Sequence, residues 1–156
     1  MTFDAWIALQ ALYADYAAAL DARDLARWPA FFTEHGVYRL QSRENFDRGL
    51  PLATMALESR AMMKDRVFGA AQTIFHHPYH QRHVVGAPRV VAEDDRGLHC
   101  EASYVVIRTK RDAMPEILSV GRSIDTVVAT AEGLRFAERL VVFDNDLIAN
   151  SIIDPI

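Results

Sequence analysis

Hydrophobic residues near the start of the chain recur with the period of an α-helix. One apolar stripe has spacings of 3, 4, 3 and 4 residues and consists of Trp6, Leu9, Tyr13, Tyr16 and Leu20. This spacing predicts an amphipathic helix that buries one of its faces. Asp21 is placed to cap a second, shorter helix that reaches Trp28, and Ser59 is placed to cap a third helix that reaches Val67.

The second half of the chain alternates between hydrophobic and polar positions, which is the pattern of half-buried β-strands. Strands are predicted over residues 84–92, 100–109, 117–129 and 134–144, with hairpin turns at 93–97 and 130–133. An earlier strand is predicted at 37–41, followed by a polar loop over 42–49. Helices ahead of an antiparallel meander predict one α+β domain over residues 1–156. Its curved, cone-shaped sheet wraps the first helix, and Gly86 and Gly121 supply curvature.

Length and charge narrow the class of protein. A chain of 156 residues with 51% hydrophobic and 24% charged residues is typical of one globular domain. The net charge of −4 argues against a nucleic-acid partner. No apolar run approaches the roughly 20 residues that span a bilayer. The first residues lack the basic region of a secretory signal, so the expected location is the cytoplasm.

A group of histidines around Pro78 is the first candidate for chemistry. Four of the eight residues from 76 to 83 are histidine, and imidazole is the commonest transition-metal ligand. Pro78 interrupts helical spacing, and no glutamate lies between two histidines four residues apart. We favour a histidine-rich connector that leads into a strand, while a metal site on His76, His77 and His80 stays open.

Charged residues inside the apolar strands are the second candidate: Arg108, Arg122, Asp125, Glu138 and Arg139. A charge that points into a core must find a partner. Arg122 and Asp125 lie on opposite faces of one strand, so pairing must cross between strands. The natural pairs are Arg139 with Asp125, or Glu138 with Arg122. These groups would form a buried network or face a protein partner, which we favour, or they would line the cone as an acid–base site.

Two further features limit the chemistry. The single cysteine, Cys100, excludes a disulfide within the chain and any iron–sulfur or thiolate zinc site held by this chain alone. The apolar segment 150–156 contains three isoleucines. We expect it to dock either on its own sheet or on another subunit.

Short motifs in the same order along nearly the whole chain resemble one known family. They are Tyr-Ala-Ala-Ala-Leu-Asp at 16–21, Trp-Pro-Ala-Phe-Phe at 28–32, Tyr-Arg-Leu at 38–40, Lys-Asp-Arg-Val at 64–67, His-Pro at 77–78, Arg-His-Val-Val-Gly at 82–86, Tyr-Val-Val-Ile-Arg-Thr at 104–109, Gly-Arg-Ser-Ile-Asp at 121–125, Val-Phe-Asp at 142–144 and Asn-Ser at 150–151. The set resembles the small (beta) subunits of Rieske aromatic-ring-hydroxylating oxygenases. Ser123 departs from it, since many relatives have tyrosine there. Segments 43–45, 51–54 and 150–156 are most similar to small subunits that serve carboxylated aromatics, such as salicylate 5-hydroxylase and the anthranilate and terephthalate dioxygenases.

The resemblance implies a fold, a partner and a role. The fold is the cone shared with ketosteroid isomerase and nuclear transport factor 2, and the role is that of a non-catalytic assembly subunit. Three large and three small subunits assemble, and the large (alpha) subunit carries a Rieske [2Fe–2S] cluster and a mononuclear non-haem Fe(II). A separate reductase supplies the large subunit with electrons from NAD(P)H. The reductase, or a ferredoxin, would be only an indirect partner of this chain. This chain is expected to hold no catalytic, cofactor or metal residues. Its structural or interface residues are expected to be Trp28, Arg82, His83, Arg122, Asp125 and Arg139.

A second hypothesis comes from a different functional class. A cone of this kind could be a stand-alone dehydratase or isomerase that uses aspartate, histidine and tyrosine side chains in its cavity. An open pocket with converging tyrosine and carboxylate groups would favour that enzyme. A cavity filled by tryptophan, phenylalanine and methionine, with a partner on the sheet, would favour the assembly subunit.

Overall fold

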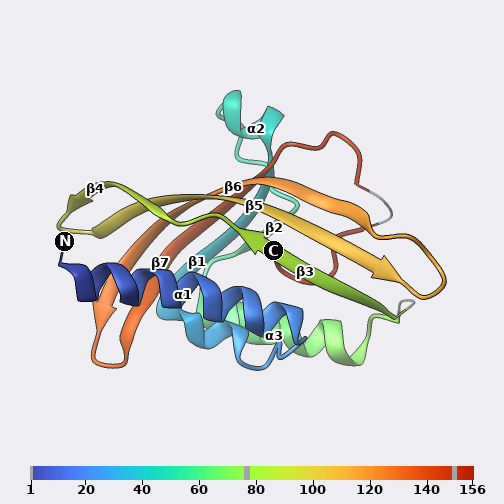
Figure 1. Ribbon diagram of the computed structural model, residues 1–156, viewed down its shortest axis with the longest axis horizontal. Coiled ribbons are helices and arrows are strands. Elements are labelled where there is room, and N and C mark those ends of the chain that lie inside the picture. Colours follow the sequence, from blue (N-terminus) through green and yellow to red (C-terminus); the bar gives the residue numbers. More distant parts are fainter. Residues whose placement is uncertain (1, 76–77, 149–150) are drawn as a thin grey trace.

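A strongly curved β-sheet with the two longest helices on its concave side makes up the computed structural model, which describes residues 2–75, 78–148 and 151–156. The elements are α1 (Phe3–Asp21), η1 (Trp28–Phe31), β1 (Phe32–Ser42), α2 (Arg43–Asp47), β2 (Met55–Leu57), α3 (Arg60–Gln72), β3 (Tyr79–Val85), β4 (Arg89–Asp94), β5 (Gly97–Lys110), β6 (Glu116–Thr130) and β7 (Gly133–Phe143). The strand order is β2-β1-β7-β6-β5-β3, and β4 also pairs with β5. Figure 1 shows α1 crossing beneath this sheet, which confirms the predicted α+β cone.

Helix α1 forms where the apolar stripe predicts it. The Thr2 hydroxyl caps it by accepting a hydrogen bond from the Ala5 amide at 3.2 Å. Leu9, Tyr13 and Leu20 of the stripe are buried. Trp6, the first member of the stripe, is 39% exposed, because the helix extends past the edge of the sheet at that end.

Two predictions about the strands need correction. The sheet is mixed, because β1 pairs with β7 in parallel while the other strand pairs are antiparallel. Alternation in the sequence determines which face a strand buries, not the direction of its neighbour. The single strand predicted over 84–92 is two strands that pair in succession with one edge of β5. Pro88 lies in the break, where it lacks the amide that a ladder requires.

The early connections also differ from prediction. The predicted loop 42–49 contains α2, because the Ser42 hydroxyl accepts from the Asn45 amide at 3.3 Å and caps a short helix. No regular α-helix follows α1 directly. The chain turns at Arg23, whose φ is +55°, and then forms the 3₁₀-helix η1 with Pro29 in its first turn.

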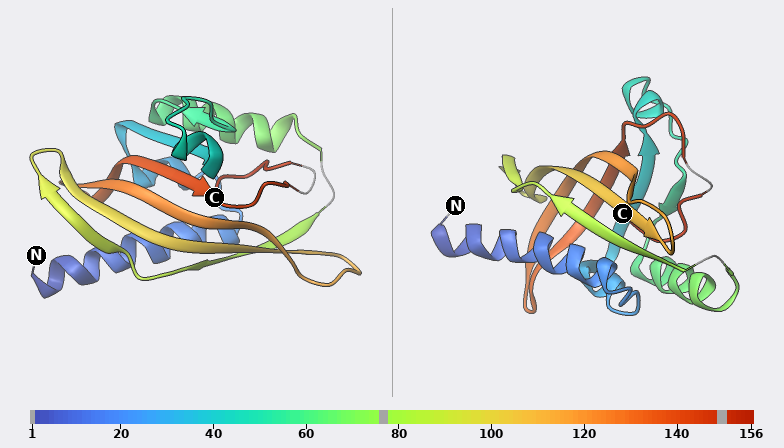
Figure 2. Two further views of the ribbon diagram at one scale, coloured as in Figure 1. Left: turned by 90° about the horizontal axis from the view of Figure 1, so that it is seen from above. Right: turned by 45° about the vertical axis from the view of Figure 1, so that its right-hand side comes forward.

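The concave side of the sheet is filled by large side chains. We call the space between this face, α1 and α3 the cone interior. Its largest fully buried side chains include Trp28, Tyr38, Phe32, Phe136 and Met63. Several of these rings meet edge to face, with the Trp28 and Tyr38 centroids 5.2 Å apart. Residues 152–156 also return to the middle of the molecule, beside α3 (Figure 2).

Candidate functional site

A buried ion pair joins β6 and β7 in the cone interior. Asp125 and Arg139 are directly opposite each other in the antiparallel register, and Arg139 Nη1 lies 3.0 Å from Asp125 Oδ2. Both side chains are almost completely buried, at 1% and 3% exposure of the residue. This confirms the cross-strand pair that the sequence predicts.

Asp125 Oδ2 accepts two more hydrogen bonds. The Tyr13 hydroxyl of α1 donates at 2.5 Å and the Ser123 hydroxyl donates at 2.7 Å. Ser123, which departs from the family pattern, therefore contributes directly to the buried network. The other carboxylate oxygen, Oδ1, and the Arg139 Nε atom have no hydrogen-bond partner among the described residues.

Burial dominates the electrostatics of this network. Burial raises the pKa of Asp125, although Arg139 and the two hydroxyl donors oppose that rise. Burial alone would lower the pKa of Arg139, but the charge of Asp125 raises it above its ordinary value. Burial and the neighbouring carboxylate also raise the pKa of Tyr13, which keeps its phenol neutral. The three donors to Oδ2 hold the carboxylate, the guanidinium and the Tyr13 phenol in fixed positions.

Aromatic rings surround the guanidinium of Arg139. Its central carbon lies 4.4 Å from the centroid of the Tyr16 ring and 4.7 Å from that of Phe136. The Tyr16 hydroxyl accepts a hydrogen bond from Trp28 Nε1 at 3.0 Å and donates to the main-chain oxygen of Ile156 at 2.9 Å. Burial raises the pKa of Tyr16 to about 12. Trp28 therefore lies in the packed interior and orients a neighbouring phenol.

Arg82 and His83 lie in the middle of β3 and contact the end of α1. His83 Nδ1 lies 2.7 Å from Asp21 Oδ1, and the His83 amide donates to the same oxygen at 2.9 Å. Arg82, on the other face, is exposed and lies 3.5 Å from Asp21 Oδ2. These contacts with Asp21 hold the end of α1 against β3. His83 Nε2 has no hydrogen-bond partner among the described residues.

Arg122 and Glu138 do not form the predicted pair. The register places Arg122 opposite Val142 and Glu138 opposite Thr126, so the two charges are separated along the strands. Arg122 is exposed on the convex face, and its guanidinium carbon lies 5.5 Å from the centroid of Phe46 in α2. The bulge between Thr126 and Val127 does not cause this separation, because the hairpin register without it would still place Arg122 three positions from Glu138. The bulge instead places Arg139, rather than Glu138, opposite Asp125.

The histidine group is only partly described. His76 and His77 lie outside the described residues, and His80 is exposed on β3. Across 2–75, 78–148 and 151–156, no group of three or more His, Cys, Asp or Glu side chains is arranged to hold a metal ion.

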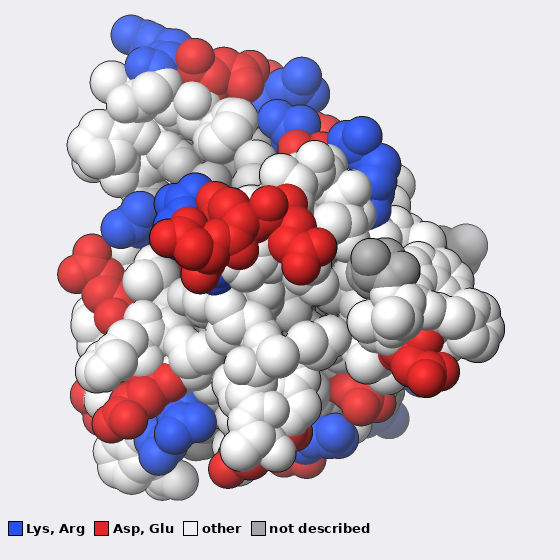
Figure 3. Space-filling view, turned by 90° about the vertical axis from the view of Figure 1, so that its left-hand side faces the viewer, with Lys and Arg blue, Asp and Glu red and all other residues white. Residues whose placement is uncertain are grey.

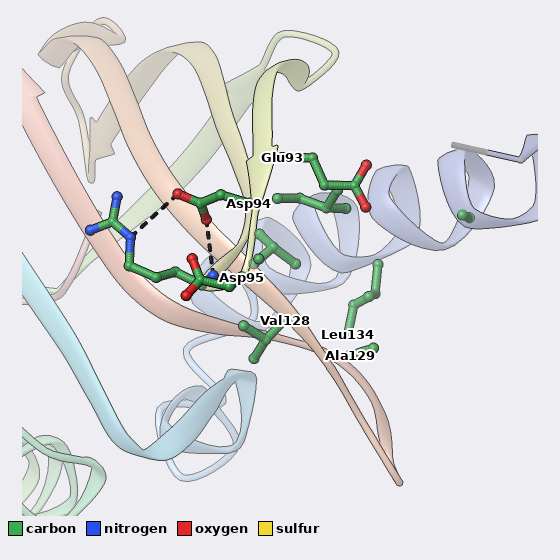
Figure 4. Close-up of a pocket in the computed structure, with 11 residues that line it drawn as sticks. Glu93, Asp94, Asp95, Val128, Ala129 and Leu134 are labelled. Carbon is green, nitrogen blue, oxygen red and sulfur yellow. Dashed lines mark hydrogen bonds and ion pairs between the residues drawn. The ribbon is translucent and has the colours of Figure 1, made fainter.

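A surface pocket of about 400 Å³ lies away from this network, at the β4–β5 hairpin. Asp94 turns back toward Arg96, while Val128 and Leu134 contribute apolar surface (Figure 4). Figure 3 shows the face that carries the hairpin, where acidic side chains gather beside uncharged surface. Asp94 also lies 2.8 Å from His99 Nε2, so hydrogen bonds and ion pairs within the hairpin account for its position.

Comparison with known proteins agrees with the cone-shaped fold. The model of the SnoaL-like domain family matches residues 5–140. The anthranilate 1,2-dioxygenase small subunit of Burkholderia cepacia is 30% identical over 151 residues, which cover 97% of this chain and 94% of that protein. The chain belongs to the small subunits of aromatic-ring-hydroxylating dioxygenases, within the SnoaL-like family.

Solved structures place this small subunit in the same group. A protein of Novosphingobium aromaticivorans assigned as a beta subunit of an aromatic-ring-hydroxylating dioxygenase superposes with a TM-score of 0.87, at 30% identity and 97% coverage of both chains. The beta subunit of benzoate 1,2-dioxygenase from Burkholderia mallei has a TM-score of 0.73 at 15% identity, covering 90% of this chain and 92% of that one, and supports the fold alone. No helix of the described small subunit is both long and apolar enough to cross a membrane.

The sequence did not reveal one cluster of the small subunit, which lies where the end of α1, strand β3 and the segment 151–156 meet. Asp154 is 2% exposed and lies 3.5 Å from Arg23 at the end of α1. The Tyr79 hydroxyl of β3 lies 3.5 Å from the same carboxylate. The sequence gives one sign of this cluster: Asp154 lies between isoleucine and proline in an apolar segment, where a charged side chain needs a partner. Its partners come from elements far apart in the sequence.

Proposed function

We propose that this small subunit is a non-catalytic assembly subunit of a multicomponent oxygenase that hydroxylates a carboxylated aromatic ring in aromatic catabolism, in the cytoplasm. The observation that carries the proposal is the 30% identity to the anthranilate 1,2-dioxygenase small subunit along almost the whole length of both chains. Anthranilate and terephthalate, named in the relatives, are both aromatic carboxylates. We take salicylate, another member of that class, as the first substrate to test.

The proposed partner is a large oxygenase subunit, in a complex of three large and three small subunits. The large subunit would hold the Rieske [2Fe–2S] cluster and the mononuclear Fe(II), and a reductase would deliver electrons from NAD(P)H. The cysteine content of the small subunit supports this division. A Rieske centre uses two cysteine and two histidine ligands, and this chain has one cysteine, Cys100, which is buried.

The packing of the cone supports a structural role. Trp28, His83, Asp125 and Arg139 are proposed as internal supports, since each is held by contacts inside the small subunit. Arg82 and Arg122 are proposed as interface residues, since both are exposed on the sheet.

The alternative function is a dehydratase or isomerase in the cone. Its support is the 2.5 Å contact between Tyr13 and Asp125, together with the TM-score of 0.69 to a protein of Novosphingobium aromaticivorans assigned as a scytalone dehydratase. That likeness, at 18% identity, concerns the fold alone. The assembly role is the better supported, because Asp125 Oδ2 already has three donors and large side chains surround it.

Co-expression with the large-subunit gene tests the proposal. The small subunit is expected to co-purify stoichiometrically in a red-brown complex that contains iron, and to be colourless when purified alone. Charge reversal at the exposed interface residue Arg122, Arg122→Glu, is expected to reduce recovery of the large subunit without lowering the Tm of the small subunit. Arg48→Ala, at the exposed residue that follows α2, is the control. A small subunit that ignores the large subunit and dehydrates or isomerises a carbonyl substrate would overturn the assembly role.

A further inference from the structure

Residues 151–156 lie in the cone interior without belonging to a helix or a strand. Ile152, Asp154 and Ile156 are 9%, 2% and 3% exposed. Figure 2 shows this segment between the sheet and α3.

Two phenols converge on one main-chain oxygen of this segment. The hydroxyl of Tyr16 donates to the Ile156 oxygen at 2.9 Å, and the hydroxyl of Tyr38 lies 3.2 Å from it. Tyr38 also accepts from the Ile156 amide at 2.9 Å. Because Trp28 donates its indole proton to Tyr16, the phenol proton of Tyr16 is directed at the acceptor.

The Tyr16 phenol that donates to this oxygen is surrounded by aromatic rings and lies against a positive charge. Phe31, Phe32 and Phe136 each lie with their ring centroids 5.6 to 6.3 Å from that of Tyr16. The guanidinium of Arg139 packs on the same phenol. Flat apolar walls with a few convergent polar donors are the usual features of a small-molecule site.

The contacts at the rim come mostly from single side chains. Arg66 of α3 donates to the Ile153 main-chain oxygen at 2.6 Å. Asp154 lies 3.5 Å from Arg23 and 3.5 Å from the Tyr79 hydroxyl. Residues 151–156 belong to no strand ladder, so their release would break none of the hydrogen bonds between strands.

We propose that residues 152–156 form a plug in a ligand site, and that the uncovered site takes a flat ring bearing a carboxylate or carbonyl oxygen. The ligand oxygen takes the position of the Ile156 oxygen between Tyr16 and Tyr38, and the ring packs on the aromatic walls. The site is separate from the assembly role, because it needs no contact with the large subunit.

The apparent affinity for a ligand equals the intrinsic affinity of the open site multiplied by the fraction of molecules in which the plug is displaced. A change that raises this fraction tenfold therefore raises the affinity about tenfold. Asp154→Asn is the most direct change of this kind, since it keeps the size of the side chain and removes the charge that faces Arg23.

Fluorescence of Trp28 provides the measurement. The chain has two tryptophans, so Trp6→Phe, at the exposed start of α1, leaves Trp28 beside the site as the sole reporter. In this background, Asp154→Asn is expected to bind benzoate about tenfold more tightly than the parent. Asp144→Asn is the matched control, since Asp144 pairs with exposed Arg43, and its affinity is expected to stay within about twofold of the parent.

Two more variants keep the test decisive. Arg66→Ala loosens the plug from α3 and is expected to raise the affinity in the same direction, even where Asp154→Asn folds poorly. Adding Tyr38→Phe to Asp154→Asn removes one oxygen donor and is expected to lose about tenfold in affinity. The proposal would be overturned if Asp154→Asn and Arg66→Ala fold but bind benzoate no more tightly than the parent. It would also be overturned if adding Tyr38→Phe to Asp154→Asn leaves the affinity unchanged. Neither result bears on co-purification with the large subunit.

Discussion

At the scale of single residues, the Asp125–Arg139 pair has the largest consequences. Each charge has left water, and each depends on the other for most of its compensation. Tyr13 and Ser123 add hydrogen bonds to one carboxylate oxygen only. Removing one member therefore leaves a buried charge without its counter-ion, whereas removing both leaves none.

Arg139→Met is expected to lower the free energy of unfolding by about 3–5 kcal/mol. Asp125→Leu combined with Arg139→Met is expected to lower it by less than Arg139→Met alone. Urea denaturation followed by circular dichroism measures both values. Arg48→Ala, which breaks an exposed pair with Glu44, is the control and should change stability by less than about 1 kcal/mol. If Arg139→Met lowers the free energy of unfolding by no more than Arg48→Ala does, then Asp125 and Arg139 do not stabilise each other in the folded chain.

At the scale of elements, the close approach of β6 and β7 depends on Gly121. A Cβ atom at this position would lie 2.0 Å from the Val142 carbonyl oxygen and 3.0 Å from the Phe143 Cα atom. Both are backbone atoms, which cannot move aside without separating the strands. Gly69 in α3 has the opposite environment, since a Cβ atom there would have the Thr73 hydroxyl oxygen as its nearest neighbour, at 3.9 Å.

Gly121→Ala and Gly69→Ala are therefore expected to change stability in opposite directions. Gly121→Ala should destabilise the fold by about 2–3 kcal/mol, because the added methyl overpacks a strand pair. Gly69→Ala should stabilise it by about 1 kcal/mol, because alanine loses less backbone entropy in a helix. Thermal unfolding of the two variants beside the parent measures the difference. A Tm for Gly121→Ala equal to that of the parent would contradict the geometry at β6 and β7.

At the scale of the whole molecule, buried phenols connect the helices, the sheet and the segment 151–156. Tyr13 reaches β6, Tyr16 and Tyr38 reach Ile156, and Tyr104 bonds to Ser119 within the sheet. Burial raises the pKa of Tyr16 to about 12 and of Tyr104 to about 12, against an ordinary value near 10.

These raised pKa values predict a loss of stability in alkali. Between about pH 10 and 12 the unfolded chain releases phenol protons that the folded chain retains. The free energy of unfolding therefore falls as the pH rises, by about 1.4 kcal/mol per pH unit for each such phenol. Urea denaturation at several alkaline pH values measures the slope, and Tyr104→Phe is expected to reduce it. Tyrosinate absorbance that appears well before unfolding would contradict the burial of these phenols.

Much of the fold follows from local patterns. The stripe through Tyr13 and Tyr16 predicts α1, and the alternation along 117–129 and 134–144 predicts β6 and β7, because one buried face imposes its period on the sequence. The same alternation faces Asp125 and Arg139 inward and so predicts their pairing. The order of short motifs along the chain resembles that of the family.

Only the tertiary structure decided the rest. The parallel pairing of β1 with β7 depends on the topology of the sheet, and the position of Arg139 directly opposite Asp125 depends on the bulge between Thr126 and Val127. Local alternation specifies neither. The place of Asp154 beside Arg23 and Tyr79 depends on how the last segment docks. These contacts join residues far apart in the chain, and their energies arise only when the sheet curves around α1 and the interior closes.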